Sequence, residues 1–356
     1  MLCLVGIGIY GISGLSQKAT KVLGNSDVIY VERFTSLISV DDIKTLASLP
    51  QLINKKIVTV QRWFVEDGRQ LIEESKDKNV TLLSYGDPLI ATTLIELRLR
   101  AMDRGINISV IYGISGITSS IGECGLQIYK MGRIVTMMEE KNSAISVYNT
   151  IYSNLQFNCH TLILSEYRYN EDNTYFYLEP KAIMKMLKET EKDLKFEILN
   201  DDSFFIVASR IGTEYQKIIS GKMNSLLNID FETGPHTLIF PARLHFTEEK
   251  ALEKLTFNLD YPTGNSTDPN NISNRMMRKY LPMIQDEISK LRRSNPSLRE
   301  SGRVFSEILD NAEYYIDDAI NFQAQGKNEL AILSVGYADG LVDSINCILK
   351  KGKHQA

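Results

Sequence analysis

The sequence has few of the residues that usually cross-link a protein or ligate a metal. Its 356 residues include only four cysteines, four histidines and one tryptophan. The cysteines, Cys3, Cys124, Cys159 and Cys347, form no CxxC pair and have no histidine near them at the spacing of a zinc site. The sequence therefore predicts no bound metal and no disulfide framework, which is typical of a protein of the reducing cytoplasm.

The sequence also lacks an excess of either charge and a long hydrophobic run near its start. Lysine and arginine number 40 against 44 acidic residues, so no global field draws the protein to nucleic acid or anionic lipid. The apolar start, residues 1–15, is shorter than the roughly 20 residues that span a membrane, and four glycines interrupt it. No basic segment precedes this run, so we interpret it as a buried first strand. Together with the balanced charge, this predicts neither a membrane nor a nucleic acid as a partner.

Short runs of Val, Ile and Leu alternate with amphipathic stretches from the start to about residue 257. This alternation is typical of β-α units around a mostly parallel sheet, so the predicted class is α/β. The clearest strand candidates are Leu2–Ile9, Val28–Val31, Ile57–Val60, Val80–Leu83, Ile108–Tyr112, Thr161–Leu164, Phe204–Ala208 and Thr237–Phe240.

The character of the sequence changes after residue 257. Pro, Gly, Asn and Asp crowd into residues 258–272, which we interpret as a linker. Beyond it, residues 273–350 predict a small all-α antiparallel helical bundle, with breaks at Ser294-Asn295-Pro296 and at Gly326. Its three apolar stripes are Met277, Leu281, Ile284, Ile288 and Leu291; Val304, Ile308, Ala312, Tyr315, Ala319 and Phe322; and Leu330, Tyr337, Leu341 and Ile348.

A glycine motif follows the first predicted strand. Residues 6–11 read G-x-G-x-x-G, and Glu32 ends the next strand about 20 residues later, as in dinucleotide-binding folds. That pattern alone favours an NAD-dependent oxidoreductase. The motif requires a helix that begins within the glycine turn, whereas the apolar periodicity here begins only at Leu15. The oxidoreductase is therefore the weaker of the alternatives.

A second loop, Gly86-Asp87-Pro88, lies between a predicted strand and a helix that begins near Thr92. Ligands bind at such loops in open α/β sheets, although Gly-Asp-Pro alone is also an ordinary tight turn. The two loops together, with the wording G-D-P-L-x-A-T-T in the second, resemble those of the diphthine synthases, which are tetrapyrrole methylases. The resemblance continues through residues 126–132, 160–164 and 235–245, and it spans roughly the first 257 residues.

The resemblance implies a fold of two α/β subdomains, about 1–115 and 116–257, with the cofactor cleft between them. It implies an S-adenosylmethionine-dependent methyltransferase that releases S-adenosylhomocysteine. The acceptor would be the modified histidine of translation elongation factor 2, which is methylated repeatedly on its amine to give diphthine. A cytoplasmic homodimer is also implied.

Carried over residue by residue, the resemblance implies eight cofactor-binding residues, and it does not identify a general base. They are Ile9, Asp87, Ile90, Gly116, Ile117, Ser165, Ser209 and His236. Three depart from the usual family residue, since Gly116 replaces a serine, Ser165 a leucine and Ser209 an alanine. A carboxylate at Asp87 suits a cationic sulfonium, whereas His236 has a cofactor-binding, a catalytic and a structural interpretation.

Two further alternatives remain. A tetrapyrrole or ribosomal RNA methyltransferase would use the same fold and cofactor. The other is a binding module. Residues 273–350 resemble a small archaeal helical domain of uncharacterised function, and their first predicted helix is basic. That helix carries Arg275, Arg278, Lys279, Lys290, Arg292 and Arg293, which suit an acidic protein or RNA.

Overall fold

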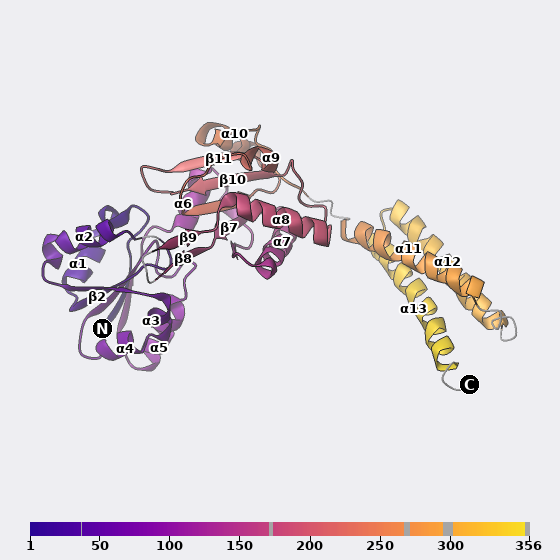
Figure 1. Ribbon diagram of the computed structural model, residues 1–356, viewed down its shortest axis with the longest axis horizontal. Helices are drawn as coiled ribbons and strands as arrows, with labels where there is room; N and C mark the ends of the chain where they lie inside the picture. Colours follow the sequence, from indigo (N-terminus) through magenta and orange to yellow (C-terminus); the bar gives the residue numbers. More distant parts are fainter. Residues whose placement is uncertain (37, 171–173, 267–270, 295–301, 353–356) are drawn as a thin grey trace. The chain divides into compact units, whose positions relative to one another are not determined.

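The chain forms two compact units, Met1–Ser266 and Thr267–Ala356. The computed structural model describes the chain except residues 37, 171–173, 267–270, 295–301 and 353–356 (Figure 1). Residues 258–266, which the sequence predicts as linker, belong to the first unit, because a short strand and a bridge from Asn265 to Ala242 attach them to its sheet.

The first half of unit 1 is built on a five-stranded parallel sheet. In spatial order its strands are β3 (Lys56–Val60), β2 (Val28–Glu32), β4 (Val80–Ser84), β1 (Leu2–Gly6) and β5 (Ile108–Ile111). All residues of β1, β2 and β4 are buried, as expected for central parallel strands that are covered on both faces. The loops after β1 and β4 consequently emerge side by side at the carboxyl edge of the sheet.

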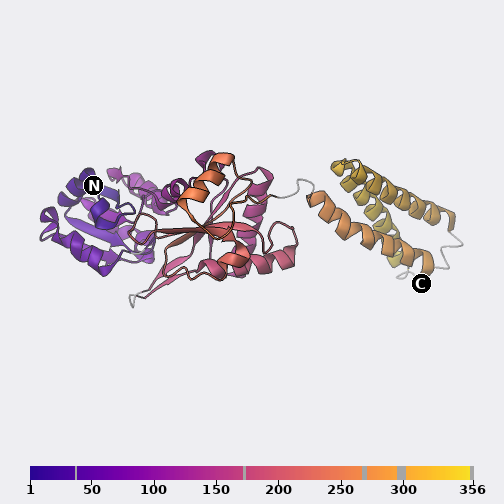
Figure 2. The ribbon, with the colours of Figure 1, turned by 90° about the horizontal axis from the view of Figure 1, so that it is seen from above.

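Helices cover both faces of this sheet (Figures 1 and 2). They are α1 (Gln17–Gly24), α2 (Val40–Ser48), α3 (Arg62–Asp67), α4 (Arg69–Glu74) and α5 (Leu94–Asp103), with a 3-10 turn η2 (Pro50–Leu52). Because neighbouring strand residues point to opposite faces, Leu4 joins the core beneath α3, α4 and α5, and Val5 joins the core beneath α1 and α2.

The second half of unit 1 contains a six-stranded mixed sheet. In spatial order its strands are β13 (Phe257–Asn258), β11 (Lys217–Lys222), β10 (Phe204–Ser209), β12 (His236–Phe240), β7 (Thr161–Ser165) and β6 (Val135–Met137). The prediction of a mostly parallel sheet is wrong here, because β10 pairs antiparallel with β11 and β12, and β12 with β7. The connection from β10 to β11 is a short loop, which permits only antiparallel pairing.

Helices also cover both faces of the second sheet. They are α6 (Gly116–Glu123), α7 (Lys141–Gln156), α8 (Pro180–Leu194), α9 (Met223–Leu226) and α10 (Phe246–Leu255), with a 3-10 turn η3 (Ile128–Lys130). Helices α7 and α8 pack on one face, and α6 and α10 on the other. A separate hairpin, β8 (Tyr167–Tyr169) and β9 (Tyr175–Tyr177), follows β7 directly.

Unit 2 consists of the helices α11 (Asn271–Ser294), α12 (Gly302–Ala324) and α13 (Asn328–Gly352). Its core contains most of the first predicted stripe, and the predicted break at Gly326 lies between α12 and α13, whereas Asn295-Pro296 lies outside the described residues. Val304 of the second predicted stripe is exposed.

The predicted core face of α13 is wrong. Leu330, Tyr337 and Ile348 are exposed, and only Leu341 of the predicted stripe packs against the core. The buried face consists of Ala331, Val335, Ala338, Val342 and Ile345. Both faces of this helix are apolar, and the one with the smaller side chains allows its neighbours to approach closely. Its residues Asn328–Leu349 are also the one segment, among the described helices, that is long and apolar enough to span a membrane.

Candidate cofactor site

Glycine residues hold three loops together at the carboxyl edge of the first sheet. The Gly8 N–H donates to the Gly86 carbonyl and the Gly86 N–H to the Gly8 carbonyl, each at 3.0 Å. A Cβ atom at Gly6 would lie 2.5 Å from the Gly86 oxygen, and one at Gly113 would lie 2.2 Å from it. Only glycine permits this approach of backbone to backbone, so the motif has a packing role.

The same contacts argue against a dinucleotide site. The N–H groups of Gly8 and Gly86 each donate to the carbonyl group of the other residue, so they are not available to a phosphate. Helix α1 begins only at Gln17, after the 3-10 turn η1 (Gly11–Gly14), which confirms the late helix onset. The Glu32 carboxylate is fully buried and accepts the N–H groups of Phe34 and Thr35, at 3.0 and 2.9 Å, instead of pointing to a ribose.

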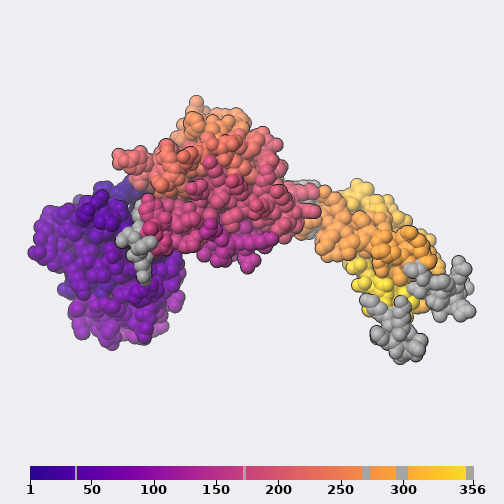
Figure 3. Space-filling model, in the orientation of Figure 1, coloured from indigo at the N-terminus to yellow at the C-terminus, as the bar shows by residue number. Residues whose placement is uncertain are grey.

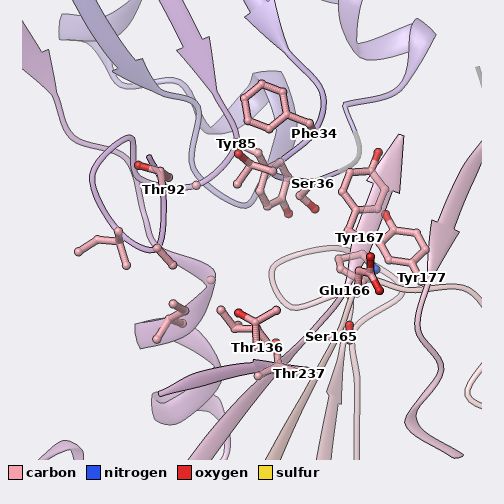
Figure 4. A pocket seen from close by; sticks show the side chains of 18 of the residues that line it. Phe34, Ser36, Tyr85, Thr92, Thr136, Ser165, Glu166, Tyr167, Tyr177 and Thr237 are labelled. Atoms are coloured by element: carbon pink, nitrogen blue, oxygen red, sulfur yellow. The ribbon is translucent and has the colours of Figure 1, made fainter. Parts of the chain in front are cut away.

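A pocket of about 840 Å³ lies in unit 1, next to these loops. Its lining comes from both halves of the unit, which Figure 3 shows in indigo to purple and in magenta to orange. The first half contributes the segments after β1, β2, β3 and β4. The second half contributes the start of α6, the ends of β6, β7 and β10, the start of β12, and the hairpin β8–β9, part of which is drawn in Figure 4.

Seven of the eight predicted cofactor residues line this pocket. They are Ile9, Asp87, Ile90, Gly116, Ile117, Ser165 and His236. Ser209 is buried and does not line it, but its hydroxyl lies 2.9 Å from His236 Nδ1, so it is directly behind the lining. At Gly116 a Cβ atom would meet Ile9 Cγ2 at an ordinary 3.6 Å, so the pocket has room for the family's serine.

Asp87 has both of the roles that its sequence context suggests. Its Oδ1 accepts the Leu89 N–H at 2.9 Å, which closes the turn after Gly86. The residue also lines the pocket and is 8% exposed, so its negative charge is held close to any bound ligand. This arrangement suits a cationic or hydrogen-bond-donating ligand group.

His236 is a neutral side chain at the pocket wall. Burial, together with the nearby Arg210 guanidinium, lowers the pKa of this imidazole to about 4, so the ring is neutral near pH 7. Within the described residues, its Nε2 atom is buried and has no hydrogen-bond partner. A buried polar atom without a partner in a pocket-lining residue makes His236 a candidate for contact with a ligand.

The prediction missed the aromatic and acidic part of the lining, which includes Tyr85, Glu166, Tyr167 and Tyr177. The last two belong to the hairpin, whose alternating aromatic residues are a sequence signal for paired strands that was not used. Among the described residues, no group of three or more His, Cys, Asp or Glu side chains is placed to hold a metal ion.

Comparison with known proteins gives the family. The model for Tetrapyrrole (Corrin/Porphyrin) Methylases matches residues 1–227. Diphthine synthase from Methanocaldococcus jannaschii is 36% identical over 262 residues, which cover 73% of this chain and all of that protein. The chain belongs to the diphthine synthase family of tetrapyrrole methylases. It is an S-adenosylmethionine-dependent methyltransferase.

Other diphthine synthases agree with this assignment. The one from Methanococcus aeolicus is 33% identical and covers 73% of this chain and 99% of that protein. A diphthine synthase crystal structure matches with a TM-score of 0.61 and 25% identity, over 72% of this chain and 96% of that chain. A second model, Protein of unknown function (DUF357), matches residues 279–348, so the helical tail is a separate family domain that these relatives lack.

Proposed function

We propose that this protein transfers methyl groups from S-adenosylmethionine to the amine of the modified histidine of translation elongation factor 2, giving diphthine and S-adenosylhomocysteine. The observation that carries the proposal is the pocket of about 840 Å³, which is lined by seven of the eight residues carried over from the family. The 36% identity to a diphthine synthase over its full length supports the substrate class.

The proposed cofactor residues divide by chemistry. Ile9, Ile90 and Ile117 offer apolar contacts, and Asp87 places a negative charge where a sulfonium can approach it. His236 adds no positive charge beside that sulfonium, because its imidazole is neutral. Ser209 positions the His236 ring from behind.

The reaction depends mainly on alignment. Methyl transfer from a sulfonium is an in-line displacement, and holding the amine and the methyl group at near-attack distance can supply most of the rate. A protonated amine cannot attack, so a proton must leave the nitrogen before the first transfer.

We also propose a homodimer in the cytoplasm. A surface groove in unit 1 is bordered by Tyr129, Phe157 and Phe246, whose exposed fractions are 94%, 81% and 70%. Exposed aromatic groups gathered in one place are typical of an interface between proteins. Sedimentation of the wild type and of Phe246→Ser tests this, and a wild type that sediments as a monomer would refute it.

The decisive experiment uses labelled S-adenosylmethionine and elongation factor 2 that carries the unmethylated precursor. We expect transfer of label to the protein acceptor, with mass spectrometry giving the number of methyl groups. Ribosomal RNA and a tetrapyrrole serve as competing acceptors, and transfer to either in place of the elongation factor contradicts the substrate. Calorimetry with S-adenosylmethionine and with NAD tests the cofactor separately.

A further inference from the structure

The pocket extends beyond the proposed cofactor residues into a part lined by Glu166, Tyr167 and Tyr177. Figure 4 shows these three side chains close together beside Ser165, with Phe34 and Ser36 of the first half on the other side of the space. Glu166 directly follows β7, and the two tyrosines lie on paired strands of the hairpin, where Tyr167 is opposite Tyr177. The hairpin and the residue just before it thus bring one carboxylate and two aromatic rings to the pocket.

The charges around the pocket favour a cation. Three arginines line it, and each is ion-paired with a carboxylate that does not line it: Arg62 with Glu66 at 3.6 Å, Arg168 with Glu139 at 2.8 Å, and Arg210 with Glu232 at 3.0 Å. Three carboxylates also line it, namely Glu32, Asp87 and Glu166. Glu232 is shared with Lys217, and burial raises the pKa of Glu32, so the lining carboxylates leave an excess of negative charge only at Asp87 and Glu166.

Glu166 contributes to this excess although it touches an arginine. Arg168 Nε lies 3.1 Å from Glu166 and its Nη2 lies 2.8 Å from Glu139, so one guanidinium serves two carboxylates and the group keeps one negative charge. Glu166 also accepts the Glu139 N–H at 2.8 Å, which fixes its position. The side chain of Glu166 is 12% exposed, whereas that of Glu139 is 59% exposed.

The two tyrosines supply neutral aromatic surface. Their ring centroids are 4.8 Å apart and the rings are nearly parallel, at 27°. Burial raises the pKa of Tyr167, so its hydroxyl stays protonated. Within the described part of the chain, that hydroxyl is buried without a hydrogen-bond partner. Tyrosine rings beside a carboxylate are the chemistry that recognises methylated ammonium groups.

We propose that Glu166, Tyr167 and Tyr177 form the acceptor subsite, which binds the cationic amine of the substrate and its methylated forms. This inference rests on the proposed function. In each transfer the nitrogen lone pair forms a bond to the methyl carbon, the carbon–sulfur bond breaks, and its electron pair goes to sulfur. The nitrogen becomes positive and releases a proton to water before the next transfer, until the third methyl group leaves a permanent cation.

The subsite suits every stage of that sequence. Except at the moment of attack, the nitrogen is positive, either as a protonated amine or as the quaternary product. A carboxylate attracts each of these cations, and aromatic rings accept the added methyl groups, which a shell of hydrogen-bond acceptors would exclude. The structure therefore assigns the hairpin to recognition of the acceptor and leaves cofactor binding to the other residues of the pocket.

The test uses two pairs of variants in the full-length protein. Glu166→Gln removes the pocket carboxylate, and Glu140→Gln is its control, because Glu140 is an exposed carboxylate that does not line the pocket. Tyr167→Leu removes a lining ring, and Tyr261→Leu is its control, because Tyr261 is an exposed tyrosine of unit 1 outside the lining. Each variant is measured for S-adenosylmethionine affinity, for KM and kcat with elongation factor 2, and for the number of methyl groups added.

We expect Glu166→Gln to raise the KM for elongation factor 2 by about tenfold, which is typical of losing one charge-assisted contact. Tyr167→Leu should accumulate mono- and dimethylated product. Both variants should keep the cofactor affinity of the wild type, which shows that they fold, and both controls should behave like the wild type.

Two failures are distinguishable. A wild type that binds S-adenosylmethionine but methylates no elongation factor refutes the proposed function. A wild type that methylates it, with Glu166→Gln and Tyr167→Leu unchanged in KM and methyl number or no different from their controls, refutes the acceptor subsite alone.

Discussion

The Ser209 hydroxyl lies 2.9 Å from Nδ1 of His236, on strands that run antiparallel and pair these two residues directly. The contact holds Nδ1 behind the pocket wall, and Nε2 has no hydrogen-bond partner among the described residues. Diphthine synthases usually have alanine at this position, which cannot make the bond. The departure from the family residue therefore adds a constraint on the imidazole and does not alter the lining itself.

Replacing Ser209 with alanine should lower the free energy of unfolding by about 1–2 kcal/mol, because the buried Nδ1 loses its partner. Cofactor affinity should fall only a few-fold, since the side chain does not line the pocket. Urea unfolding and calorimetry measure the two effects. A fall in affinity of a hundredfold with unchanged stability would mean that Ser209 contacts the cofactor directly.

The buried His236 makes stability depend on pH. Its folded-state pKa of about 4 is below the ordinary 6.5, so the unfolded chain takes up a proton first as the pH falls. The contribution is complete above about pH 6.5 and is lost as the pH falls toward 4, with about 2 kcal/mol lost by pH 5. Unfolding of the wild type and of His236→Gln at pH 7 and pH 5 checks this. The stability difference between the two proteins should shrink at pH 5, and a constant difference would contradict it.

Asp87→Asn keeps an oxygen for the turn contact to Leu89 but removes the charge. We expect S-adenosylmethionine to bind roughly 10- to 100-fold more weakly, as for the loss of a charged partner. Uncharged adenosine serves as the comparison ligand, and its affinity should change much less. Equal losses for both ligands would show that the substitution disturbs the loop and not the electrostatics.

Alanine at Gly113 should destabilise the protein by about 3 kcal/mol or more, because a backbone oxygen cannot move away from the new Cβ. Gly122, which is exposed in α6 and has nothing within 4 Å of a Cβ, is the matched control. Gly122→Ala should be neutral or stabilising by up to about 1 kcal/mol. Thermal unfolding separates the two, and similar melting temperatures would contradict the packing role of the glycines.

The exact end of unit 1 matters because of Asn265. It makes four hydrogen bonds of 2.8 to 3.0 Å, to the backbone of Phe204 and the carbonyl of Pro241. A chain that ends after Ser266 should fold and bind S-adenosylmethionine like the full chain, whereas one that ends after Gly264 should be roughly 2–4 kcal/mol less stable. Urea unfolding compares the two truncations, and equal stability would show that the hydrogen bonds of Asn265 are dispensable.

Much of the fold could be predicted because buried parallel strands are continuous apolar runs. Strand β4, for example, is buried at every residue and was predicted almost to its ends. Strand β11 was missed, because its polar ends and its glycine hide the alternation, and its neighbour β10 was placed in a parallel sheet as a result. Strand pairing is a long-range property, and local periodicity does not determine it.

The candidate site could also be predicted only in part. The loops that carry Asp87 and Gly116 follow strands and have recognisable wording, so their place beside the pocket could be predicted. Glu166 has no sequence signal of its own, since its importance comes from a hairpin that folds back on it. On α13 both faces are apolar, so periodicity does not decide which one is buried, and three of the four residues of the predicted stripe are exposed.

The reciprocal bonds between Gly8 and Gly86 have a consequence for how such a pocket can change over generations. Main-chain atoms, rather than side chains, fix the two loops that carry Ile9 and Asp87. Side chains around them, such as those of Ser165 and Ser209, can then be replaced while the loops keep their positions. Substitution of Gly6 or Gly113 would displace the loops, so the position of the site depends on residues that have no side chain.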